Sequence, residues 1–212
     1  IATAQTVNAG STGSERASNY KAMLKDRKLG YMAALKNIRN ILNAGADAET
    51  IEMLCSLFEN EKACLNSKCL PFRFTDAYRE IKDLNFDRFL IKKLISSVET
   101  GFKISARNTG LVEGDEKIAI LLDVSGSMGG KPFEVGKTLM AAMLTGLNTN
   151  NAIGYCWSDY SREVSVNGSP FEFIDRTRTQ GGGTNLAGSF KGLMDSRTKV
   201  DVIVIFTDMQ QN

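Results

Sequence analysis

Three separate segments of this 212-residue sequence carry oxygen-bearing side chains suited to metal binding. Asp123-Val124-Ser125-Gly126-Ser127 supplies one carboxylate and two hydroxyls directly after an apolar run. Gly181-Gly182-Gly183-Thr184 supplies another hydroxyl, and Thr207-Asp208 supplies a second carboxylate. Oxygen ligands suit hard cations with octahedral coordination, Mg²⁺ first and Mn²⁺ next. We therefore predict a metal site formed by Asp123, Ser125, Ser127, Thr184 and Asp208.

Charge decides what such a site would do. At most two carboxylates face the divalent ion and the hydroxyls stay neutral, so the ion keeps positive charge and an exchangeable position. A partner's carboxylate or phosphate would fill that position, which is a binding mechanism and requires no reaction. Two alternatives stay open. In the first, Ser125 and Ser127 cap the next helix while Asp123 forms hydrogen bonds within the loop. In the second, the five side chains are present but hold no metal.

The predicted ligands follow strands or precede helices in the second half of the chain. Strands are expected over residues 117–124, 153–157, 164–166 and 200–206, and helices over 133–147 and 186–195. This alternation indicates an α/β doubly wound sheet, which binds ligands at the carboxyl edge of its strands. The all-apolar stretch Val200 to Phe206 predicts a central strand buried on both faces.

The first half of the chain has helical periodicity instead. Helical pattern is expected from Tyr20 to about Asn43, interrupted at Leu29-Gly30-Tyr31, and from Ala48 to about Leu57 or as far as Ala63. Further helices are expected from Asp76 (capped by Thr75) and from Phe86 to about Val98. Short helices joined by short loops indicate an α-helical repeat of the HEAT-like kind. The expected organisation is an irregular lead-in over 1–19, helical repeats over 20–108, a Gly-containing linker over 109–115 and the α/β domain over 116–212.

Composition excludes several chemistries. The chain has no histidine, which removes Ser-His and Cys-His catalysis and His-ligated zinc. We therefore expect no enzyme activity; a metal-dependent hydrolase using the same oxygens would lack an evident base. Gly130 to Thr138 resembles a phosphate-binding loop, but five residues separate its glycines where four are required, so no nucleotide is expected. No apolar run is long enough to span a bilayer.

The four cysteines, Cys55, Cys64, Cys69 and Cys156, form no Cys-x-x-Cys pair. We expect them to be reduced and partly buried, although the first three could meet at a metal. A reducing compartment follows, so we expect a cytoplasmic protein, or part of a larger particle, that is not secreted. The chain opens on Ile1 and stops at Asn212, just after a predicted strand and an acidic loop. We expect a piece of a longer chain.

The five predicted ligands resemble the metal-ion-dependent adhesion site of von Willebrand factor type A domains, with all five positions matched over about residues 115–212. The resemblance implies a Rossmann-like domain. It also implies two or more further strand–helix units after Asp208, so either the sheet is truncated here or another segment completes it.

The helical half is similar to the TROVE module. The similarity lies in Lys28 to Asn40 and in Leu70-Pro71-Phe72-Arg73-Phe74-Thr75-Asp76-Ala77-Tyr78. A TROVE module followed by a type A domain is the architecture of the Ro ribonucleoproteins. The resemblance implies a ring of helical repeats that binds the single-stranded ends of misfolded RNAs and small structured RNAs.

Charge is compatible with an RNA partner. Residues 1–110 hold 17 Lys and Arg against 12 Asp and Glu, a net of +5, and residues 111–212 hold 9 against 12, a net of −3. The expected phosphate contacts are Lys36, Arg39 and Arg73, and the aromatic residues Tyr31, Phe72 and Tyr78 could stack bases or pack in the core. The competing hypothesis is a protein-interaction or assembly module in which the metal captures a partner's carboxylate.

Overall fold

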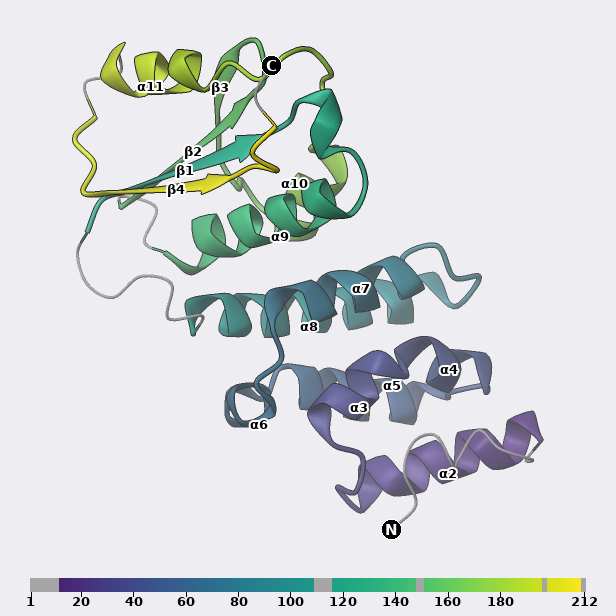
Figure 1. Ribbon diagram of the computed structural model, residues 1–212. Helices are drawn as coiled ribbons and strands as arrows, with labels where there is room; N and C mark the ends of the chain where they lie inside the picture. Colours follow the sequence, from purple (N-terminus) through teal and green to yellow (C-terminus); the bar gives the residue numbers. More distant parts are fainter. Residues whose placement is uncertain (1–11, 109–115, 148–150, 196–197, 211–212) are drawn as a thin grey trace. The chain divides into compact units, whose positions relative to one another are not determined.

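The structure is a computed structural model that describes residues 12–108, 116–147, 151–195 and 198–210. The chain divides into two compact units, Ile1–Ser105 and Ala106–Asn212. The first unit is helical and the second is built around a small mixed sheet (Figure 1).

The helical unit consists of short helices in sequence and one long one. Its elements within the described residues are α2 (Gly13–Lys25), α3 (Tyr31–Lys36), α4 (Ile38–Asn43), α5 (Ala48–Phe58), α6 (Glu61–Ser67), α7 (Pro71–Ile81) and α8 (Arg88–Arg107), the last of which runs two residues past the unit's boundary.

The start of α2 corrects the expectation that residues 1–19 are irregular. The helix begins at Gly13 because Thr12 and Glu15 form a capping box. The Thr12 hydroxyl accepts the Glu15 N–H at 3.4 Å, and the Glu15 carboxylate accepts the Thr12 N–H at 2.9 Å. Two otherwise unpaired donors are thereby satisfied. Apolar periodicity is absent from this stretch, which is why the helix was not predicted; residues 1–11 lie outside the described part of the chain.

The helix expected to begin at Asp76 begins at Pro71 instead. Leu70 is its N-cap and Pro71 occupies the first turn, where a missing N–H costs nothing. Thr75 is therefore not a cap but a buried residue inside α7. The prediction was wrong because proline was interpreted as a break when it opens the helix.

The core of the helical unit centres on buried aromatic rings. The Tyr31 ring meets the rings of Phe58 and Phe74 edge-on, with centroid distances of 5.6 and 6.1 Å. Its hydroxyl donates to the Phe58 carbonyl at 3.0 Å. Gly101 of α8 lies against all three of these residues, and a methyl group there would lie 2.6 Å from Phe74 Cε1 and 3.2 Å from the Phe58 carbonyl oxygen. The absence of a side chain therefore lets α8 approach this cluster.

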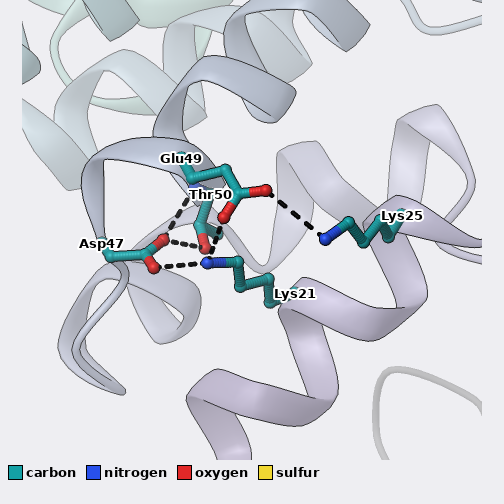
Figure 2. A network of polar contacts seen from close by, with 5 residues as sticks. All are labelled: Lys21, Lys25, Asp47, Glu49 and Thr50. Carbon is teal, nitrogen blue, oxygen red and sulfur yellow. Dashed lines mark hydrogen bonds and ion pairs between the residues drawn. The ribbon is translucent and has the colours of Figure 1, made fainter.

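A polar network joins α2 to α5 on the surface (Figure 2). Asp47 is the N-cap of α5 and accepts the Thr50 N–H and hydroxyl at 2.8 and 2.6 Å. The Lys21 ammonium pairs with both Asp47 and Glu49, and Lys25 pairs with Glu49 at 3.5 Å. These contacts lower the pKa of the Asp47 carboxyl, chiefly through its hydrogen bond from Lys21, and raise the pKa of Lys21.

The described residues of the second unit form a four-stranded mixed sheet in the order β3-β2-β1-β4. β1 is parallel to β2 and β4, and β3 is antiparallel to β2. Its elements in chain order are β1 (Ile118–Asp123), the short 3₁₀ helix η1 (Gly126–Met128), α9 (Lys131–Gly146), β2 (Ala152–Trp157), β3 (Ser161–Val164), α10 (Pro170–Arg176), α11 (Leu186–Asp195) and β4 (Val202–Phe206).

Helices cover both faces of this sheet (Figure 1). Alternate side chains of β1, such as Ile120 and Leu122, pack with Phe133 and Met140 of α9. The other face of the sheet packs against Leu193 of α11. β1 is consequently buried on both faces over its whole length, as its apolar sequence predicts.

β4 differs from its prediction. It pairs with β1 at the end of the strand order within the described part of the chain, and its side chains alternate between half-buried and exposed. Ile203 and Ile205 are 41% and 36% exposed. Within the described residues β4 is therefore not buried on both faces as expected. Its central position stays a prediction, because the sheet was expected to continue after Asp208.

Candidate metal centre and basic cavity

Asp123 stands at the end of β1 and is completely buried. One carboxylate oxygen, Oδ1, accepts the Ser125 N–H at 2.9 Å. The other, Oδ2, accepts the Thr207 hydroxyl at 2.8 Å. The carboxylate thereby links the loop after β1 to the segment after β4, 84 residues further on.

The two predicted serine ligands lie together beside it. The hydroxyl oxygens of Ser125 and Ser127 are 3.1 Å apart, and Ser125 is buried. Ser125 precedes η1 but its side chain makes no capping bond there, and the N-cap of α9 is Gly130. The alternative in which these serines cap the next helix is therefore wrong, whereas the expected bond from Asp123 to the loop is present.

Thr184 and Asp208 lie in neighbouring loops. The loop that carries Thr184 is tied to the ends of β1 and β2, since the Gln180 N–H donates to the Val124 carbonyl at 2.7 Å and the Asn185 N–H donates to the Ser158 carbonyl at 3.0 Å. Asp208 follows Thr207, which contacts Asp123. Neither Thr184 nor Asp208 bonds directly to Asp123 in the described part of the chain.

The surroundings of Asp123 are compatible with a cation. Burying an ionised carboxylate is costly unless a positive charge compensates it. Among the described residues no Lys or Arg pairs with Asp123; its partners there are an N–H and a hydroxyl. Those residues also contain no group of three His, Cys, Asp or Glu side chains placed to hold a metal. The predicted set requires no such group, because three of its five members are hydroxyls.

Two residues at this edge were missed by the sequence reasoning. Thr207 donates to Asp123, and its position directly before a predicted ligand was the available signal. Asp159 accepts the Gly183 N–H at 2.9 Å and so contacts the loop that carries Thr184. Its signal was a carboxylate two residues beyond the end of a strand.

The helical unit brings together the three residues predicted to contact RNA. Lys36, Arg39 and Arg73 line one cavity of about 460 Å³ bordered by α3, α4 and α7. Arg79 also lines the cavity, and so do two carboxylates, Asp76 and Glu80. Four cations against two carboxylates leave a net charge of +2 (4 − 2) in this basic cavity.

The two carboxylates are engaged by the cations. Arg39 Nη1 lies 2.9 Å from Glu80 Oε2, and Arg73 Nη1 lies 3.7 Å from Asp76 Oδ2. All four side chains are substantially exposed, so water screens both pairs. Lys36, at the end of α3, is exposed as well. An anion that binds arginine more tightly than these carboxylates do can therefore displace them.

The aromatic residues expected to stack bases behave differently from one another. Tyr31 is buried, and desolvation raises the pKa of its hydroxyl, so its ring is committed to the core. Phe72 and Tyr78 are half-buried. The Arg73 guanidinium lies 5.5 Å from the Phe72 ring centroid, and the Lys82 ammonium lies 5.4 Å from that of Tyr78. The possibility that Tyr31 stacks on bases is therefore wrong, because its ring is buried. One cation lies over each of the other two rings.

The cysteines are free thiols, and all four are buried. Burial raises the pKa of Cys156 to about 11 and also raises the pKa of Cys55 and of Cys64. The described residues bring no cysteines together at a metal. Within the same residues, no helix is both long and apolar enough to cross a membrane.

The chain thus combines a helical unit with a unit built around a small mixed sheet. Acidic and hydroxyl side chains lie at the carboxyl edge of that sheet. The family model for the TROVE domain matches residues 9–125, more than half of the chain. The chain belongs to the TROVE domain family, and the predicted resemblance to the Ro and TROVE proteins is confirmed.

Relatives and a solved structure agree with this assignment. The chain is similar to "Telomerase protein component 1" of Rattus norvegicus and of Mus musculus, each 33% identical over 69 residues. That match covers 32% of this chain and 3% of each relative. The crystal structure of the Deinococcus radiodurans RO (RSR) protein superposes over all of this chain with a TM-score of 0.67 at 18% identity. This chain spans 45% of that structure, and the likeness shows a shared fold.

Proposed function

We propose that this chain is a non-catalytic RNA-binding protein whose basic cavity contacts RNA phosphates. The observation that supports it most is the convergence of Lys36, Arg39 and Arg73 on one cavity. The sequence predicts these three residues as phosphate contacts, although Arg73 lies 34 residues beyond Arg39. The resemblance to Ro ribonucleoproteins favours misfolded RNAs with single-stranded ends and small structured RNAs as the ligands.

The ion pairs of the cavity fit this role. An exposed Arg–carboxylate pair contributes about 0–1 kcal/mol, so breaking it costs little. A phosphate offers the Arg39 guanidinium a bidentate, charge-assisted contact that is stronger than the exposed pair with Glu80. The carboxylates would hold the arginines extended until RNA arrives. The same contacts release counterions from RNA, which makes binding depend on salt.

The test is filter binding of the purified chain to a single-stranded RNA at several salt concentrations. The triple variant Lys36→Ala, Arg39→Ala and Arg73→Ala removes three phosphate contacts. At about 0.7 per contact for single strands, the slope of log affinity against log salt should fall by roughly 2. A matched variant removes one exposed lysine and two exposed arginines outside the cavity, Lys62, Arg88 and Arg107.

The matched variant is expected to keep most of the slope, since its residues lie elsewhere. Wild-type affinity that does not change with salt would overturn the RNA-binding proposal. If the salt slope falls equally in the two triple variants, the cavity is not the RNA-binding site. RNA would then be held only by general electrostatic attraction.

We further propose that the carboxyl edge of the sheet binds Mg²⁺, with Mn²⁺ as a substitute. Asp123, Ser125, Ser127, Thr184 and Asp208 would supply the oxygens, as in the metal-ion-dependent adhesion site that they resemble in von Willebrand factor type A domains. Asp123 is buried and, among the described residues, pairs with no Lys or Arg, which supports this proposal. The bound ion would neutralise that carboxylate and offer a position to an acidic partner.

Metal binding can be measured by titrating Mn²⁺ while following fluorescence. Trp157 is the chain's one tryptophan, is buried, and is the register partner of Asp123 in β2. Wild type should show a saturable change that Asp123→Ala loses. An identical titration in wild type and Asp123→Ala would refute the site.

A second candidate function is a protein-interaction module that uses this metal. Two large apolar side chains at the same edge favour it: Tyr160, next to Asp159, is 84% exposed, and Met209, next to Asp208, is 79% exposed. An acidic protein segment with an apolar neighbour would match them. Binding of such a segment should require metal and Asp123, while RNA binding should not change in Asp123→Ala.

A further inference from the structure

The glycine-rich loop between α10 and α11 is attached by hydrogen bonds to the ends of β1 and β2. Gly181 and Gly182 both have positive φ, +71° and +79°. A methyl group added to Gly182 would overlap the Asp159 carboxylate, 2.9 Å from its Cγ. The carboxylate therefore packs directly against backbone where no side chain fits.

Thr184 sits between two attachments to one strand end. Before it, the Gly183 N–H donates to Asp159 Oδ1 at 2.9 Å. After it, the Asn185 N–H donates to the Ser158 carbonyl at 3.0 Å. Ser158 and Asp159 directly follow β2, so the end of this strand holds both neighbours of a predicted metal ligand.

The second attachment continues into α11. Asn185 precedes that helix, and its side-chain oxygen accepts the Gly188 N–H at 3.0 Å, which satisfies a free donor of the first turn. The helix side of the loop is therefore fixed by Asn185 and Ser158. On the glycine side, Val124 holds Gln180 before the glycines, and Asp159 holds Gly183 directly before Thr184. Three flexible glycines would otherwise leave Thr184 with many backbone conformations.

We propose that Asp159 is a positioning residue that holds the glycine loop so that the Thr184 hydroxyl is preorganised for the cation. The inference rests on the proposed metal site and adds a residue to it that supplies no ligand. Loss of a residue that orients a metal ligand without binding the metal typically weakens metal binding by about 10–100-fold.

Two substitutions at Asp159 separate positioning from charge. Asp159→Ala removes the acceptor and should weaken Mn²⁺ binding by about 10-fold or more. Asp159→Asn keeps an oxygen that can accept the Gly183 N–H but removes the negative charge. If Asp159 acts by holding the loop, Asp159→Asn should stay within about 3-fold of wild type.

A third substitution reaches the same loop from the other side. Gly182→Ala forces a methyl group against the carboxylate and should weaken Mn²⁺ binding without altering any acidic group. Its matched control is Gly168→Ala, which carries the same kind of backbone strain at φ +96° but has no atom within 4 Å of the added carbon. The control should bind Mn²⁺ as wild type does.

The measurements are Trp157 fluorescence and calorimetry with Mn²⁺ on the whole chain, together with metal-free thermal melts of every variant. Asp159→Ala should melt near wild type without metal and lose the stabilisation that Mn²⁺ gives wild type. If Asp159→Ala does not fold, Gly182→Ala and Gly168→Ala decide the question.

The outcomes point to different conclusions. Wild type that binds Mn²⁺ no better than Asp123→Ala overturns the proposed metal site itself. A metal-binding wild type with unchanged Asp159→Ala and Gly182→Ala overturns the positioning role alone. A loss in Asp159→Asn as large as in Asp159→Ala also overturns it, because the charge would then be the cause.

Discussion

Gly101 of α8 offers the sharpest test of how the helical unit is packed. A methyl group at this position would press on the Tyr31 hydroxyl and lie 2.6 Å from Phe74 Cε1 and 3.2 Å from the Phe58 carbonyl oxygen. The last of these is backbone and cannot rotate away. Gly101→Ala should therefore destabilise the unit, although alanine is the better helix former.

The magnitude follows from three contributions. Overpacking a filled core costs about 1–3 kcal/mol. Displacing the Tyr31 hydroxyl from its buried acceptor, the Phe58 carbonyl, costs about 1–3 kcal/mol more. Replacing glycine inside a helix returns about 1 kcal/mol. The net is a loss near 3 kcal/mol, which for a unit of about 100 residues lowers Tm by roughly 12–24 °C.

Thermal and urea unfolding followed by far-ultraviolet circular dichroism would measure this loss. Gly30→Ala is the control: its added carbon meets no atom within 4 Å, and the change at an N-cap should cost less than about 1 kcal/mol. Tyr31→Phe removes the clashing oxygen, so Gly101→Ala should cost less by at least about 1 kcal/mol in that background. A Gly101→Ala protein as stable as wild type would refute this account of the packing.

The remaining predictions concern titration and thiol access. Because the Asp47 pKa is lowered in the folded state, the stability it contributes is present above its unfolded pKa of about 4 and is lost as pH falls. Lys21→Met should therefore lower the urea midpoint at neutral pH, and this difference should shrink as pH falls below about 4; a constant difference in acid would contradict it. The Lys21 pKa is raised, so its contribution is present below about 10.4 and is lost only as pH rises through the folded value. The Cys156 thiol, with a pKa near 11 and a buried position, should resist a thiol-specific disulfide reagent at pH about 8 and react fully in denaturant; rapid labelling in the folded state would show that β2 opens.

Sequence reasoning succeeded where local pattern and burial coincide. The apolar run at Ile118 predicted β1, and the pattern from Leu186 to Asp195 predicted α11 with the bounds that the structure has. The sequence predictions failed where a helix begins with proline or with a capping box and not with an apolar repeat. Pro71 was interpreted as a break although it opens α7, and the capping box at Thr12 was overlooked in a stretch without apolar periodicity.

The candidate sites divide in the same way. The cluster of Asp123, Ser125 and Ser127 was predictable because five consecutive residues at a strand end cannot separate. The contact from Thr207 to Asp123 and the bond from Gly183 to Asp159 join segments that lie far apart in the chain, and no local rule specifies them.

The sequence by itself determined which residues are candidates for the chemistry: oxygen-bearing side chains in three segments, the cations Lys36, Arg39 and Arg73, and no histidine for acid–base catalysis. Tertiary structure decided which of them meet. It placed Arg39 and Arg73 around one cavity, put β4 at the end of the strand order formed by the described residues and committed Tyr31 to the core. The physical reason is that side-chain type and periodicity are local properties, whereas strand order and helix packing depend on how the whole apolar surface is buried.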